Sequence, residues 1–154
     1  MLNIFLKKEL PPLTILDIHQ ASNRYNRPLP LFNSFIQAGF PSPADDYIEK
    51  ALDLNELVIQ RPAATFYVKV QGDSMQDVGI FSGDILVVDR SLTAYHKSII
   101  VAVLDGEFTV KRLSVETERT YLLAENSAYP PLKLNPESQF EVWGVVTYVI
   151  HKLR

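Results

Sequence analysis

No cysteine occurs among the 154 residues of the chain. This absence excludes disulfide bonds, thiolate catalysis and cysteine-ligated metal sites, and it is typical of proteins from a reducing compartment. An excess of positive charge is also lacking, because 15 Lys and Arg residues stand against 18 Asp and Glu residues, a net charge of −3. A nucleic-acid groove needs a basic surface, so direct sequence-specific DNA binding is not expected.

Long hydrophobic runs are missing as well. The longest, Ile99 to Leu104, is far short of the roughly 20 residues that a membrane helix needs. The N-terminal "MLNIFLKKEL" places its charges after a very short apolar stretch, the reverse order of a secretory signal. We therefore expect a cytoplasmic protein with no membrane contact. A hydrophobic content of 47% with 21% charged residues indicates a single soluble globular domain.

The first 43 residues differ from the rest in their proline content. Six of the ten prolines lie there, a density that forbids long helices. We expect a mobile arm, with at most a short helical turn over residues 13–20 capped by Thr14. A helix is predicted to follow, with Ser42 as its cap and Pro43 at its first position, ending near Asp53.

Beyond Arg61 the pattern changes to β-branched and aromatic runs separated by turn residues. Asp105-Gly106 is a hairpin signal, because this pair readily adopts positive φ angles. We predict a mainly β fold: a compact, bent or partly closed β domain with a flexible N-terminal arm and one short helix. The predicted strands span residues 65–70, 84–89, 98–104, 107–113, 120–125 and 140–150.

Ser74 stands out in "VQGDSMQDVGIFSGDILVVD" (residues 70–89). A serine after Gly-Asp is most often a turn residue, and it becomes a nucleophile only when a base accepts its proton. The G-x-S-x-G elbow of the hydrolases is absent. The three histidines, His19, His96 and His151, lie in no recognisable triad.

Lys111 is a better candidate for the base. It lies in the apolar strand "EFTVKRL", where alternation separates it from its neighbour Arg112 onto the opposite face. Lowering the pKa of a lysine from about 10.4 to near 7 requires about 4 to 5 kcal/mol, which burial can supply. Arg112 cannot be neutralised in this way. An ordinary exposed strand lysine is the alternative that this segment alone leaves open.

A possible substrate lies upstream, in "FIQAGFPSPADDY". Ala38 and Gly39 have minimal side chains, which allow a nucleophile to approach the peptide bond, and Gly39 permits a sharp backbone turn. Apolar neighbours such as Phe35 and Phe40 could seat the segment in a cleft. Taken by itself, the stretch also fits an ordinary linker.

Together, "AGFPSPADDY", "VQGDSMQDVGIFSGDILVVD" and "DGEFTVKRL" resemble the LexA-type (peptidase S24) self-cleaving proteins, and most closely their UmuD branch, the SOS mutagenesis proteins. The resemblance covers about residues 31 to 154. It implies that Ser74 is the nucleophile, Lys111 its general base, and Ala38-Gly39 the bond that the protein cuts in itself. The backbone N–H groups of Ser74 and Met75 are the candidate oxyanion donors. No metal or cofactor is implied.

The resemblance also implies partners and a division of the chain. Residues 1–38 form the arm removed on self-cleavage, and residues 39–154 form the β-rich peptidase-like domain. The RecA–single-stranded DNA filament promotes cleavage after DNA damage. The processed form is a homodimer that joins a UmuC-type Y-family polymerase in translesion synthesis, and "FEVWGVVTYVIHKLR" is a candidate dimer surface.

The chain departs from the family pattern in three places. Its bond is Ala-Gly, as in LexA repressors, where UmuD proteins have Cys-Gly. Its arm is longer than is usual for the UmuD branch, yet too short and proline-rich for the winged helix-turn-helix of LexA. Lys97 stands where the family usually has glycine. A non-catalytic interaction subunit, a LexA-like transcriptional regulator and a signal peptidase remain as alternatives.

Overall fold

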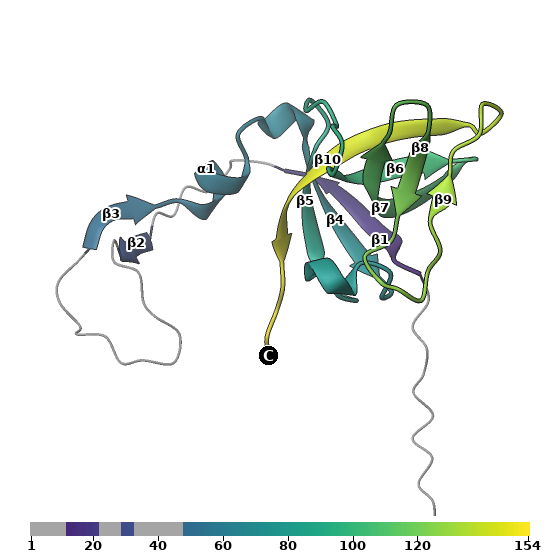
Figure 1. The fold of residues 1–154 in the computed structure, drawn as a ribbon. Coiled ribbons are helices and arrows are strands. Elements are labelled where there is room, and N and C mark those ends of the chain that lie inside the picture. Colours follow the sequence, from purple (N-terminus) through teal and green to yellow (C-terminus); the bar gives the residue numbers. More distant parts are fainter. Residues whose placement is uncertain (1–11, 22–28, 33–47) are drawn as a thin grey trace, which may run out of the picture.

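The computed structural model describes residues 12–21, 29–32 and 48–154, with the backbone alone at 29–32 and 48–50. Eight strands form one curled sheet in the order β1-β4-β5-β10-β6-β7-β8-β9, and β2 and β3 form a separate antiparallel pair. Figure 1 shows the sheet bent into a half-barrel, with the β2–β3 pair projecting away from it. The strands are β1 (Thr14–Gln20), β2 (Leu29–Phe32), β3 (Ile48–Leu52), β4 (Thr65–Gln71), β5 (Ile85–Asp89), β6 (Ile99–Leu104), β7 (Glu107–Val115), β8 (Thr120–Leu123), β9 (Leu132–Lys133) and β10 (Phe140–Ile150).

The predicted fold class is confirmed, and all six predicted strands are present. The hairpin prediction is also confirmed, since Leu104 pairs with Glu107 across a two-residue turn in which Asp105 and Gly106 have φ of 50° and 84°. Helical structure within the described part of the chain is limited to α1 (Leu54–Val58) and two short 3-10 turns, Pro62–Ala64 and Gln76–Val78. None of these helices is long and apolar enough to cross a membrane.

Two predictions for the N-terminal third are wrong. Residues 14–20 are not a helical turn but strand β1, which pairs antiparallel with β4. The predicted helix from Ser42 to Asp53 is replaced over Ile48–Leu52 by strand β3, while residues 42–47 lie outside the described part. The helix begins after Asp53 instead, because the Asp53 carboxylate accepts a hydrogen bond of 2.8 Å from the Asn55 N–H and so caps α1.

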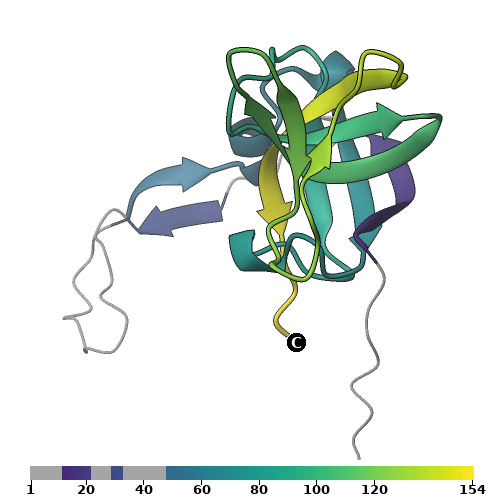
Figure 2. The same cartoon turned by 45° about the vertical axis from the view of Figure 1, so that its right-hand side comes forward.

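The curl of the sheet follows from the long strand β10. Its pairing shifts register between Val142 and Gly144 against β6, and between Val146 and Tyr148 against β5. Such bulges bend a strand and increase its twist. A side chain at Gly144 would meet Val88 Cγ1 at 2.6 Å, so the sheet is also closely packed at this bend. Figure 2 shows the resulting turn of the sheet about β10.

Curling brings together strands that are distant in the sheet order. β4 and β7 are separated by β5, β10 and β6, yet both contribute to one core inside the half-barrel. β1 closes this side, since it pairs with β4 and also approaches β7. The core cluster consists of Leu13, Val68, Val70, Met75, Ile80, Leu86, Val88, Val101 and Val110.

Candidate active site

Ser74 lies in the turn that follows β4, where the chain leaves the sheet at Gly72. Gly72 has φ of 115°, in the region that favours glycine, so the chain can turn sharply before the serine. The Gly72 N–H donates to Ser82 Oγ at 3.2 Å. Ser74 itself is fully buried, with an exposed fraction of 0%. A fully buried hydroxyl needs a partner, and the partners of this one identify the site.

The second Gly-Asp of the segment has a structural function. Gly83 N–H donates to the Val70 carbonyl at 2.8 Å, and Val70 N–H donates to the Asp84 carbonyl at 3.0 Å, which ties the loop back to β4. The buried Asp84 carboxylate accepts from the Phe81 N–H at 2.8 Å and lies 2.5 Å from His151 Nδ1. These contacts close the loop that contains the nucleophile candidate.

Lys111 reaches Ser74 from the opposite side of the half-barrel. It occupies the middle of β7, and its Nζ donates to Ser74 Oγ at 3.1 Å. Burial lowers the pKa of the Lys111 ammonium below its ordinary value of 10.5. The neighbouring Arg112 points elsewhere, pairing with Glu125 and donating to the Lys97 carbonyl at 2.6 Å. The sequence argument that separates the two cations is therefore confirmed geometrically.

Ser74 Oγ has a second partner that the sequence did not suggest. The backbone N–H of Leu13 donates to Ser74 Oγ at 3.0 Å across 61 positions of the chain. The Leu13 side chain is almost completely buried in the core beside Met75. The segment preceding β1 therefore lies directly against the serine hydroxyl.

The histidines lie apart from this pair of residues. His19 lies on β1 and contacts Asp17, His96 accepts a hydrogen bond from the Val115 N–H, and His151 contacts Asp84. Within the described residues no group of three or more His, Asp or Glu side chains is arranged to hold a metal ion. Ala38 and Gly39 lie outside the described residues, in the segment between β2 and β3.

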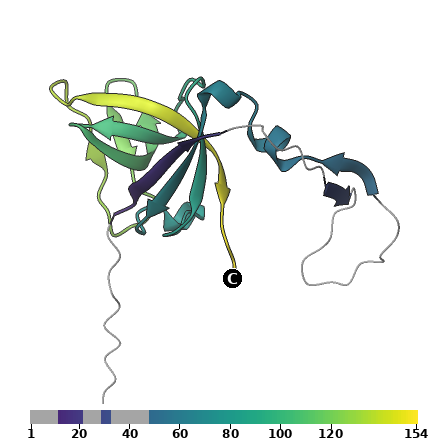
Figure 3. The same cartoon turned by 180° about the vertical axis from the view of Figure 1, so that it is seen from behind.

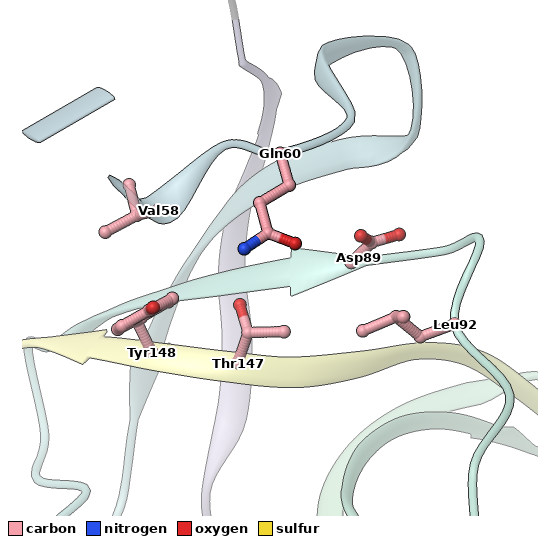
Figure 4. A pocket seen from close by; sticks show the side chains of 6 residues that line it. All are labelled: Val58, Gln60, Asp89, Leu92, Thr147 and Tyr148. Carbon is pink, nitrogen blue, oxygen red and sulfur yellow. The ribbon is translucent and has the colours of Figure 1, made fainter. Parts of the chain in front are cut away.

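A shallow cavity of about 260 Å³ opens elsewhere, between β5, β10 and the segment after α1 (Figure 4). Its lining includes neither Ser74 nor Lys111, and its Asp89 carboxylate is already occupied by Arg61 and Ser91. The candidate nucleophile and base therefore lie outside this cavity. It is lined by Val58, Gln60, Asp89, Leu92, Thr147 and Tyr148.

A fully buried serine hydroxyl held by a lysine amine of lowered pKa is the arrangement of a Ser/Lys peptidase. A family model described as peptidase S24-like matches residues 30–147 of the chain. The chain belongs to the peptidase S24-like family. The matched region includes Ser74, Lys111 and Ala38-Gly39.

Individual relatives support the same family assignment. Protein SamA of Salmonella typhimurium is 52% identical over 125 residues, covering 81% of this chain and 86% of that protein. Protein MucA of Escherichia coli is 46% identical over 121 residues, covering 78% and 82%. The LexA repressor of Mannheimia succiniciproducens is more distant, at 34% over 138 residues, covering 88% and 64%. The resemblance to the UmuD branch of this peptidase S24-like family is confirmed.

Proposed function

We propose that this peptidase S24-like protein cleaves itself between Ala38 and Gly39, with Ser74 as the nucleophile and Lys111 as the general base. The single observation that supports this best is the 3.1 Å contact between Lys111 Nζ and Ser74 Oγ. Burial favours the neutral amine, whose lone pair can accept the serine proton. The match of residues 30–147 to the peptidase S24-like family, which includes both residues, supports the assignment.

The chemistry proceeds in two steps. Lys111 takes the proton of Ser74 while Oγ bonds to the carbonyl carbon of Ala38, and the Ala38–Gly39 C–N bond then breaks as Lys111 returns the proton to the Gly39 amine. Lys111 then deprotonates a water that attacks the acyl carbon, and it returns this proton to Ser74 Oγ as the Oγ–C bond breaks; the new Ala38 carboxyl group loses its proton to solvent. The N–H groups of Ser74 and Met75 are the proposed donors to the oxyanion.

The processed form, residues 39–154, is proposed to act as a dimeric accessory subunit of a UmuC-type Y-family polymerase in translesion synthesis. The RecA–single-stranded DNA filament promotes the cleavage that generates it. A net charge of −3 suits a protein that contacts other proteins and leaves DNA binding to them. Cleavage by purified protein, with and without activated filament, tests this function through the mass of the product that begins at Gly39.

An exposed apolar patch supports dimerisation. Ile150 pairs with Ile85 on β5, and Tyr148 lies two positions before Ile150 on the same face of β10. Each is at least 36% exposed, and contiguous apolar surface of this kind is typical of a protein interface. We call this the C-terminal apolar patch; it consists of Ile85, Tyr148 and Ile150.

A further inference from the structure

Strand β1 occupies the edge of the sheet next to the candidate dyad. It pairs antiparallel with β4 from Thr14 opposite Gln71 to Gln20 opposite Phe66. Figure 3 shows β1, in dark purple, running beside β4 along the open edge of the half-barrel. An edge strand of this kind uses main-chain groups that any other extended peptide can use. The edge of β4 is therefore a surface suited to an extended peptide.

The start of this strand also covers the nucleophile. Leu13 is 1% exposed and its N–H donates to Ser74 Oγ, while Ser74 is 0% exposed. A carbonyl carbon must come to about 3 Å from Oγ before attack can occur. The Leu13 N–H lies at that distance from Oγ, so this side of the hydroxyl is already occupied.

We propose that residues 13–20 are a self-inhibitory strand, held on the edge of β4, that must leave before the Ala38-Gly39 segment of this chain can reach Ser74. This inference rests on the proposed function. Leu13 anchors the segment in the core, but within β1 only Ile15 and Ile18 are partly buried, and a register shift interrupts the pairing between Ile15 and Asp17. A strand so held can be released while the rest of the sheet stays paired.

Full-length variants test the blocking strand. Ile18→Asn loosens β1 by placing a polar side chain against the core. Leu13→Pro removes the N–H that donates a hydrogen bond to Ser74 Oγ and keeps an apolar side chain. Leu16→Asn is the matched control, because Leu16 lies on the same strand but is 52% exposed. The first readout is the rate at which a fluorophosphonate labels Ser74, followed by intact mass; the second is self-cleavage at alkaline pH without filament.

The proposal predicts that both disruptive variants are labelled and cleaved at least tenfold faster than the parent protein, with Leu16→Asn within twofold of it. Equal or slower labelling of Ile18→Asn and Leu13→Pro overturns the proposal and makes β1 a supporting part of the site. If both disruptive variants are labelled faster but no protein cleaves itself, the proposal of a blocking strand is supported and the proposed self-cleavage function is contradicted. Lys111→Met serves as the unlabelled reference.

A second set of contacts, independent of β1, holds the turn that contains Ser74. Asn126 Nδ2 donates to the Asp73 carbonyl at 3.0 Å, and the Tyr129 hydroxyl donates to Asp73 Oδ1 at 2.6 Å. The Asp77 N–H donates to the Glu125 carbonyl at 2.8 Å. The residue immediately before the nucleophile is thus fixed by side chains that lie more than 50 positions later in the chain.

The same segment also contacts the strand that holds the base. The Glu125 carboxylate pairs with Arg112, the residue after Lys111 in β7. The segment 125–129 therefore links the turn of Ser74 to the strand of Lys111. We infer that Asn126 and Tyr129 are positioning residues that set the distance between Ser74 Oγ and Lys111 Nζ. Neither touches the reacting atoms.

Tyr129→Phe tests this role because it removes one hydroxyl and keeps the ring, with Tyr95→Phe as control, since Tyr95 is 70% exposed. Fluorophosphonate labelling is measured from pH 6 to 11. A positioning role predicts that Tyr129→Phe has a 10- to 100-fold lower plateau rate of labelling with an unchanged midpoint pH, at temperatures well below its melting temperature. The same result is expected for Asn126→Ala. A plateau within twofold of the parent overturns the inference, whatever the melting temperature does.

Discussion

Lys111 Nζ and Ser74 Oγ lie 3.1 Å apart although their residues are 37 positions apart in the chain. The contact depends on the curl of the sheet, since β4 and β7 are separated by three strands in the sheet order. Because burial also lowers the pKa of Lys111, one relationship supplies both the geometry and the protonation state that nucleophilic catalysis by a serine needs.

Substitution of either member is expected to abolish self-cleavage. Ser74→Ala removes the nucleophile and Lys111→Met removes the base without leaving a buried charge, so each should lower the rate by at least about 10³-fold. Lys111→Arg should be equally inactive, because a guanidinium does not deprotonate. Intact-mass time courses measure the effect. His96→Ala is the control, and a loss of cleavage in it equal to that of Lys111→Met would point to a histidine base.

Self-cleavage is expected to accelerate with pH. Only the neutral amine accepts the serine proton, so the rate should rise tenfold per pH unit and level off at the pKa of Lys111, which burial places below 10.5. The midpoint is read from rates between pH 6 and 11. A rate that is flat across this range contradicts a lysine base.

The same pKa has a consequence for stability. Because burial lowers the pKa of Lys111 in the folded state, the unfolded chain binds more protons between that lowered value and 10.5, and the free energy of unfolding rises with pH across this window. Denaturant unfolding of Ser74→Ala, which cannot cut itself, should show the rise. The double variant Ser74→Ala/Lys111→Met lacks the titrating group and should show a smaller one.

Much of the β domain could be predicted from local pattern. Runs such as residues 84–89 and 140–150 are β-branched and bounded by turn residues, and the structure pairs them as Val149 opposite Leu86 and Ile150 opposite Ile85. The candidate dyad was predicted through the family resemblance; the strand pattern alone predicted only that Lys111 and Arg112 lie on opposite faces. The structure places one against Ser74 and the other against Glu125.

The failures have physical causes. Proline density predicted at most a short helical turn over residues 13–20, but the prolines flank residues 14–20 without interrupting them, so this segment pairs with β4 as a strand. The sequence predicts a helix end near Asp53 because an aspartate beside an apolar run fits either boundary, whereas the capping contact of Asp53 places it at the start of α1. Asn126 and Tyr129 were missed because their contacts with Asp73 span more than 50 positions, which no local spacing encodes.

Lys97 stands where the family usually has glycine, and the cost of this difference can be measured as a change in the free energy of unfolding. It has φ of 76°, in the left-handed region that costs a non-glycine residue about 1 kcal/mol or more. Lys97→Gly should therefore raise the free energy of unfolding by up to about 1 kcal/mol, measured by denaturant titration. Lys97→Ala keeps the strained φ and separates this effect from loss of the side chain. Destabilisation by the glycine variant alone would contradict the explanation.

The C-terminal apolar patch gives a prediction about assembly. Ile150→Asp, 42% exposed on β10, should shift the protein from dimer to monomer because it places a charge within an apolar interface. Sedimentation velocity over a range of concentrations measures the change. Leu132→Asp, 43% exposed on β9, is the control outside the patch. Dimers that survive Ile150→Asp but not Leu132→Asp would move the interface to β9.

The most direct test of the self-cleavage account is an intact-mass time course of the purified protein, alone at pH 7 and 10 and at pH 7 with activated RecA filament. The account predicts one new product that begins at Gly39, formed at pH 10 without any partner and at pH 7 with the filament, and absent from Ser74→Ala under every condition. A stable full-length chain in all three conditions, or the same product from Ser74→Ala, would contradict it.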